Sequence, residues 1–107
     1  MTSMHWYNSI SFFFGGAFLA NSVPHLGNGI SGRPFQTPFA SPPGRGLSSA
    51  VVNVAWGFFN LVVAYVLLVV VGHFDLDNVA HVVSTGAGML VLALMMARSF
   101  GKLHGGA

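Results

Sequence analysis

The sequence predicts an all-α integral membrane protein with three transmembrane helices in a single membrane domain, residues 1–107. Charged residues make up only 6% of the chain and hydrophobic residues 53%, whereas soluble domains have roughly 25% charged residues. The apolar residues form three continuous runs and do not alternate with polar ones, which favours helices over strands. A helix also satisfies its own backbone polar groups, as a hydrocarbon environment requires.

The first apolar segment covers about residues 6–23, and Pro24 is expected to end it because proline cannot continue helical hydrogen bonding. No lysine or arginine precedes this segment, so we expect a retained span rather than a signal peptide. The second and third segments cover about residues 47–71 and 79–100. At about 1.5 Å per residue, each segment can cross a hydrocarbon core of roughly 30 Å.

Two connections and a tail complete the predicted topology. Residues 72–78 form an outer loop that is short enough to make the second and third spans an antiparallel hairpin. Residues 101–107 form an inner tail. Residues 24–46 form a long Pro/Gly-rich inner loop, which contains all five prolines of the chain.

The long loop is predicted to be an ordered cap. It lacks the high charge of a disordered segment, and its prolines reduce the conformational freedom that ordering removes. Its Pro-Phe steps suit contact with the bilayer interface or a neighbouring subunit. The residues expected to contact lipid or a partner are Arg33, Phe35, Phe39 and Arg45.

The basic residues predict the orientation of the chain. The four lysines and arginines lie in the long loop or near the end of the third span, and an odd number of spans places these regions on one side. The opposite side has Asp75 and Asp77 and no basic residue. The positive-inside rule therefore predicts an outer N-terminus and an inner C-terminus, in the cytoplasmic membrane.

Each predicted span has one face of polar or small residues, because residues at i, i+3, i+4 and i+7 lie on the same side of a helix. An unpaired amide or imidazole in hydrocarbon costs several kcal/mol, so these faces should point at protein. Counting inward places Asn53 and His25 at similar depth. The polar positions are Asn8, Ser11, Asn53, Asn60, Tyr65, His81, Ser84 and Thr85.

A second candidate site lies in the outer loop, where His73, Asp75, Asp77 and His81 form an H-x-D-x-D-x3-H run. Imidazole and carboxylate groups suit Zn²⁺, Cu²⁺ or Ni²⁺. The alternative is a solvated turn in which Asp77 or Asn78 caps the third helix. The spacing matches no metal-site motif, which favours the turn. A metal ion here would be the only cofactor, and none is predicted.

The composition excludes several function classes. No enzyme is expected, because the only two carboxylates lie in one turn and no nucleophile has a base beside it. Four basic residues are too few for a nucleic-acid surface. The polar and small faces favour a helix-packing subunit of a homo-oligomer or of a larger membrane complex, with lipid and other subunits as partners.

Two alternatives remain open. One is an oligomeric channel or carrier for a small solute or ion, lined by Asn8, Asn60, Tyr65, His81 and Thr85. A proton-coupled carrier would need a charged group in mid-span, which the chain lacks. The other is an outer-face metal-binding membrane protein.

Overall fold

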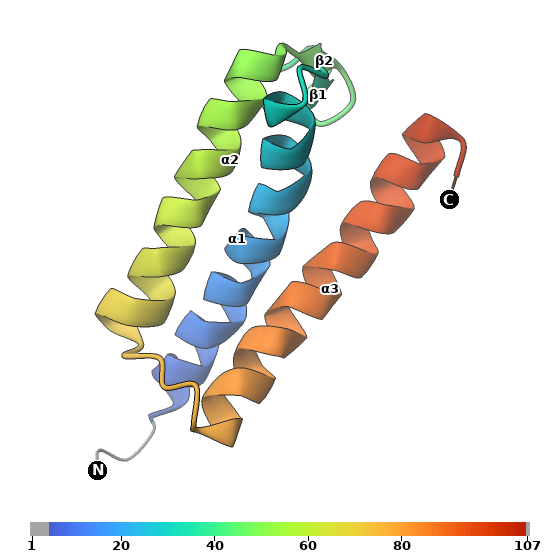
Figure 1. Ribbon diagram of the computed structural model, residues 1–107. Coiled ribbons are helices and arrows are strands. Elements are labelled where there is room, and N and C mark those ends of the chain that lie inside the picture. The colour runs from blue at the N-terminus through green and yellow to red at the C-terminus, as the bar shows by residue number, and fades with distance from the viewer. Residues whose placement is uncertain (1–4, 107) are drawn as a thin grey trace.

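The computed structural model describes residues 5–106, which form three long helices and a small hairpin (Figure 1). Helix α1 covers Trp6–Ile30, and α2 covers Ala50–Tyr65 and continues into a π-helix, η1, at Val66–Val71. Helix α3 covers Val79–His104. Strands β1 (Phe35–Gln36) and β2 (Leu47–Ser48) pair in antiparallel fashion between α1 and α2. The predicted helical class is therefore confirmed.

Two of these helical segments are long and apolar enough to cross a membrane, Ala50–Val71 and Val79–His104. They match the second and third predicted segments. Only 17% and 11% of their most apolar stretches are buried in the chain, unlike the core helices of a soluble protein. Helix α1 is not one of the two, because polar residues such as Asn8, Asn21 and His25 interrupt it.

Helix α1 lies between α2 and α3 and packs against both, while α2 and α3 have little contact with each other over residues 5–106 (Figure 1). Helix α3 diverges from the other two toward its C-terminal end. The three helices therefore form an open layer rather than a closed bundle. Among the helices of residues 5–106, α1 alone is covered on two sides.

Glycines allow the helices to approach closely on both sides of α1. Gly16 faces the backbone carbonyl of Thr85, and Gly88 faces the backbone of Phe13, so a Cβ at either position would overlap main-chain atoms of the other helix. Toward α2, a Cβ on Gly29 would lie 2.7 Å from the Ala50 carbonyl oxygen. Small residues at such crossings are typical of membrane helix pairs.

The prediction that Pro24 ends the first helix is wrong, because α1 continues through it to Ile30. Proline at position 24 removes one helical hydrogen bond, the one to the Ala20 carbonyl. Side chains bond to other carbonyls of the same stretch, and α1 packs against both neighbouring helices. Asn28 Nδ2 donates to the Pro24 carbonyl at 2.8 Å, and Ser22 Oγ donates to the Leu19 carbonyl at 2.6 Å. The loop predicted at residues 24–46 therefore begins later than predicted, because the first non-helical residue is Ser31.

The end of α3 and the start of α2 also differ from the residues predicted from the sequence. Helix α3 begins at Val79, as predicted, but runs to His104, so most of the predicted tail is helical. The second helix begins at Ala50, where Ser49 accepts a hydrogen bond from the Val52 amide. Residues 31–49 fold back over the ends of the helices, and the Gly44 amide donates to the Thr37 carbonyl at 2.9 Å.

A glycine pair on α3 tests the close crossing with α1. Gly88→Ala should lower the free energy of unfolding by about 2 kcal/mol, because the new methyl group forces the two backbones apart. Gly86→Ala is the matched control, since nothing lies within 4 Å of a Cβ at that position. Alanine there should stabilise the helix by up to about 1 kcal/mol. The free energy of unfolding of each variant is measured in detergent by titration with dodecyl sulfate. Equal changes in the two variants would contradict the close crossing.

Candidate functional site

Asn53 is the centre of a buried polar cluster beneath the loop. Its side chain is fully buried. Its Nδ2 group donates to the carbonyls of Phe35 at 3.1 Å, Ser48 at 3.2 Å and Ser49 at 3.0 Å. Its Oδ1 lies 2.8 Å from His25 Nδ1 on α1. One side chain of α2 therefore joins α1 and both strands.

This arrangement defines the hydrogen-bonding roles of His25. Because the two amide hydrogens of Asn53 are shared among three carbonyls, its oxygen faces the imidazole as an acceptor. His25 Nδ1 must therefore carry a hydrogen, which leaves Nε2 as the acceptor on a neutral ring. The ring is only 2% exposed, and its centroid lies 5.6 Å from that of Phe35 and 6.3 Å from that of Trp56.

The loop also contacts the end of α3. Phe35 is buried, and its ring centroid lies 4.8 Å from that of Phe100. The buried Gln36 side chain lies 3.0 Å from His104 Nε2 through its Oε1. Phe35 therefore packs within the chain, whereas the sequence predicted that it contacts lipid or a partner. Its aromatic partners come from distant parts of the chain, which local sequence does not reveal.

A chamber of about 340 Å³ lies beneath the loop. Uncharged residues from the loop and from the helices line it, and none of the lining side chains is an acid, a lysine or an arginine. Trp56 is one of them, and its buried Nε1 has no hydrogen-bond acceptor within the described chain. The polar residues of the lining are Asn21, His25, Gln36 and Thr37.

A second polar pair lies farther along α1 and α2. Asn21 Nδ2 donates to Asn60 Oδ1 at 3.0 Å, and Asn60 Nδ2 donates to the Trp56 carbonyl at 2.8 Å. Asn60 is fully buried. Asn21 was not among the predicted site residues, because the first helix was expected to end soon after it. In the longer helix, Asn21, His25 and Asn28 share one face at i, i+4 and i+7.

The other predicted polar positions occupy separate environments. Ser11 is buried and donates to the Leu67 carbonyl in η1, and Thr85 is buried with no partner for Oγ1 among residues 5–106. Asn8 accepts from the His5 amide at the start of α1. Tyr65 is 58% exposed, so it has few contacts within its own chain. Ser84 is half-buried on α3.

Three of the four residues of the predicted metal site bond to one another in the turn before α3. The His81 Nδ1 accepts from the Asp75 amide at 3.0 Å, and an oxygen of Asp75 accepts from the Asp77 amide at 3.0 Å. His73 is exposed. Nowhere in residues 5–106 do three or more potential ligands come close enough to hold a metal ion. The predicted site therefore does not form.

Asn78 provides the cap that the sequence predicted as the alternative. It is the N-cap residue of α3, and its Oδ1 accepts from the amides of Ala80 at 3.0 Å and His81 at 3.4 Å. These bonds satisfy amides that the first turn of a helix leaves free. The polar residues of this connection thus have a local structural role.

The remaining loop residues lie at the surface. Arg33 and Arg45 are exposed, and Arg33 Nε donates to Asn28 Oδ1 at 3.2 Å. Phe39 is 66% exposed, with its ring centroid 5.0 Å from that of Trp56.

The polar groups beneath the loop offer neutral donors and acceptors, which can bind an uncharged polar group or stabilise the fold. The same residues offer no fixed charge to a ligand. Comparison of the chain with protein-family models, curated proteins and solved structures finds no match.

Replacing Asn53 tests whether it holds the loop on the helices. Asn53→Leu keeps similar volume but removes the side-chain donor to the Phe35 and Ser48 carbonyls and the acceptor of His25, at a cost of roughly 3 kcal/mol. Amide hydrogen exchange of residues 35–48 should then accelerate strongly. Asn8→Leu, at the far end of α1, is the control and should leave exchange in the loop unchanged. Equal exchange in Asn53→Leu and the parent chain would show that the loop is held by other contacts.

Proposed function

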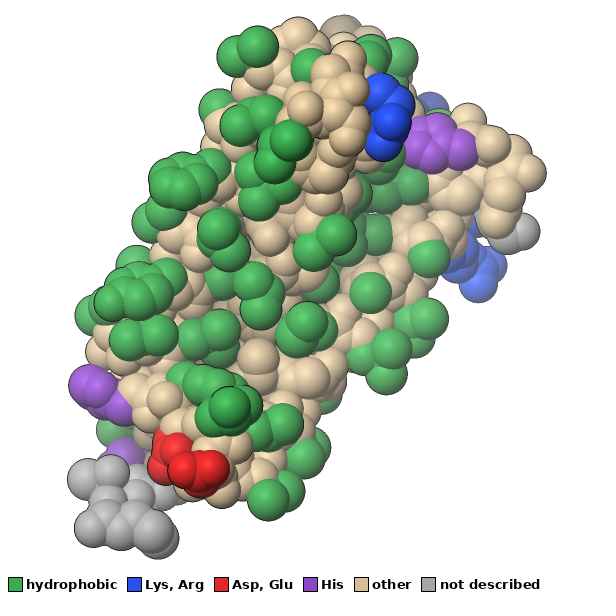
Figure 2. Space-filling view, viewed as in Figure 1, with side chains coloured by type: hydrophobic (Ala, Val, Ile, Leu, Met, Phe, Trp, Pro, Cys, Tyr) green, Lys and Arg blue, Asp and Glu red, His purple; other side chains and the backbone are tan. Residues whose placement is uncertain are grey.

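We propose that this chain is an integral membrane protein with three membrane-crossing helices, acting as a helix-packing subunit of a homo-oligomer or of a larger membrane complex. The open layer of helices carries this proposal. Large hydrophobic side chains are exposed along α2 and α3 (Figure 2), while most of the buried polar side chains lie at contacts with α1. This distribution is the inverse of that in a soluble domain and suits a lipid environment.

Helix α1 serves as the third span despite its polar residues. Its 25 residues extend about 37 Å, enough to cross the hydrocarbon core. Its most polar groups are turned toward the other elements and hydrogen-bonded, as with Ser11 to Leu67, Asn21 to Asn60 and His25 to Asn53. A polar side chain with a protein partner costs far less in lipid than one without.

The charge distribution supports the proposed orientation. Figure 2 shows the acidic side chains near the connection between α2 and α3, and basic side chains at the opposite end of the molecule. The basic end holds the loop and the C-terminal end of α3. By the positive-inside rule, this end faces the cytoplasm.

A partner helix has a suitable place on the open flank of α1. Residues of all three helices line a hollow of about 290 Å³, among them Phe14 and Ala17 of α1, Asn60 of α2 and Leu92 of α3. Phe14 is 50% exposed there. A helix seated in this hollow would cover the exposed aromatic surface and would find a hydrogen-bonding partner in the half-buried Asn21 amide. Such bonds stabilise membrane helix pairs.

The carrier alternative is less well supported. Asn60 is already engaged within the chain, Tyr65 faces outward, and His81 belongs to the turn before α3. These side chains do not converge on one path.

Filling the hollow should prevent assembly without breaking bonds inside the chain. Ala17→Trp places a large ring where the partner helix would lie, whereas Ala87→Trp, at an exposed position of α3 outside the hollow, is the control. Native mass spectrometry from mild detergent should show the parent chain and Ala87→Trp as assemblies and Ala17→Trp as a monomer. The same stoichiometry for all three chains would contradict this contact surface.

Single cysteines test the orientation, because the natural chain has none. In intact bacterial cells, Asp77→Cys should react with a membrane-impermeant maleimide, because residue 77 is expected outside. Arg45→Cys and Lys102→Cys should react only after the cells are permeabilised. Reaction of position 45 or 102 in intact cells would reverse the orientation.

A further inference from the structure

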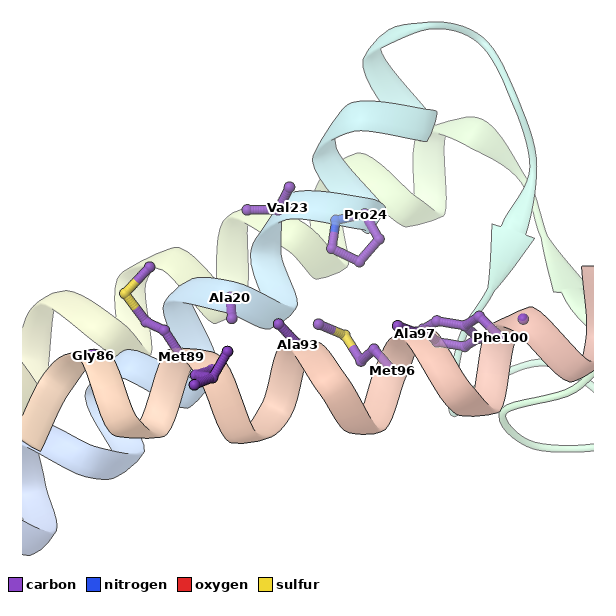
Figure 3. A pocket seen from close by; sticks show the side chains of 11 residues that line it. Ala20, Val23, Pro24, Gly86, Met89, Ala93, Met96, Ala97 and Phe100 are labelled. Atoms are coloured by element: carbon purple, nitrogen blue, oxygen red, sulfur yellow. The ribbon is translucent and has the colours of Figure 1, made fainter. Parts of the chain in front are cut away.

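An apolar groove of about 710 Å³ lies between α1 and α3 (Figure 3). Ala20 and Pro24 of α1 face Ala93, Met96 and Ala97 of α3 across it. Every residue in its lining is apolar or glycine. The groove exists because the glycine crossing of α1 and α3 lies near one end of the two helices, beyond which α3 diverges.

This groove adjoins the polar chamber beneath the loop. Phe100 lines both hollows. On α1, the lining of the groove reaches Pro24, and the next residue, His25, lines the chamber. The apolar groove and the uncharged hydrogen-bonding groups of the chamber therefore lie next to each other, with Phe100 shared between them.

The chamber offers one donor and one acceptor close together. Trp56 Nε1–H is buried without an acceptor in the part of the chain that the structure describes, and His25 has Nε2 as its acceptor nitrogen. The two rings are neighbours in the lining of the chamber, with centroids 6.3 Å apart and ring planes inclined at 71°. A hydroxyl group both accepts and donates, and it would satisfy both nitrogens.

We propose that the groove and the chamber together bind one neutral amphiphile, with its hydroxyl head between Trp56 and His25 and its apolar body along α3. A charged head is disfavoured because no residue of opposite charge lines the chamber. The flexible side chains of Met89 and Met96 can adapt to the shape of an alkyl chain. This inference rests on the proposed membrane placement and is independent of the proposed assembly.

The test uses the full chain in phosphatidylcholine vesicles and a long-chain primary alcohol that carries a photoreactive diazirine in mid-chain. After irradiation, mass spectrometry should locate the adducts on groove residues between Met89 and Phe100. Excess hexadecan-1-ol should compete, while hexadecane, which lacks the hydroxyl, should compete poorly.

Two variants test separately the contact with the hydroxyl head and the contact with the apolar body of the ligand. Trp56→Phe removes the donor and should lower the labelling yield about fivefold, the effect of losing one hydrogen bond. Ala97→Leu fills the groove and should abolish labelling there, whereas Ala87→Leu, outside the groove, should label like the parent chain. If Ala97→Leu does not insert into the membrane, Ala93→Leu fills the same groove.

Three results would overturn the proposal: adducts spread evenly over the lipid-facing residues, equal competition by hexadecane, or unchanged labelling of Trp56→Phe. A crosslink between two copies of the chain through groove residues would assign the groove to a partner helix instead. Release of the chain from membranes by alkaline carbonate would reject the membrane placement itself, and so distinguishes that failure from a failure of the binding site.

Discussion

A hydrogen-bonding group that is withdrawn from water needs a partner within the protein, and the rest of this structure depends on that requirement. Asn53 and Asn60 are fully buried on α2, and both bond to side chains of α1. Helix α1 has polar residues along much of its length, so it gains most from being covered on two sides. Its central place between two more apolar helices follows from this need.

Glycines let α1 occupy that central place. Gly16 and Gly88 lie against each other's helix backbone, and Gly29 and Gly57 do the same between α1 and α2. Close backbones bring short side chains such as Ser11 within reach of carbonyls on the neighbouring helix. The same geometry leaves α2 and α3 apart. Both helices pack against α1, and they hardly contact each other. The hollows on either side of α1 result from this order of packing.

Local patterns predicted the features that depend on neighbours in sequence. Continuous apolar runs predicted the helices, and Asn78 was predicted as a cap of the helix that starts at Val79. The errors concern long-range contacts. Pro24 is tolerated because side chains and packing support the helix beyond it, and Phe35 is buried by Phe100 from the other end of the chain. The polar groups around His73 bond to their own turn, which spacing alone does not distinguish from metal ligation.

The π-helix η1 gives the chain a place that can absorb a change of length. A π turn holds one residue more than an α turn, so removing a single residue from Val66–Val71 can restore α-helical winding with little rotation of the residues beyond it. Removing a residue from the α-helical stretch Ala50–Tyr65 would instead rotate everything beyond it by about 100°. That rotation would carry Leu67 away from Ser11 and Gly72 away from Phe12. A one-residue deletion should therefore be tolerated much more readily in Val66–Val71 than in Ala50–Tyr65.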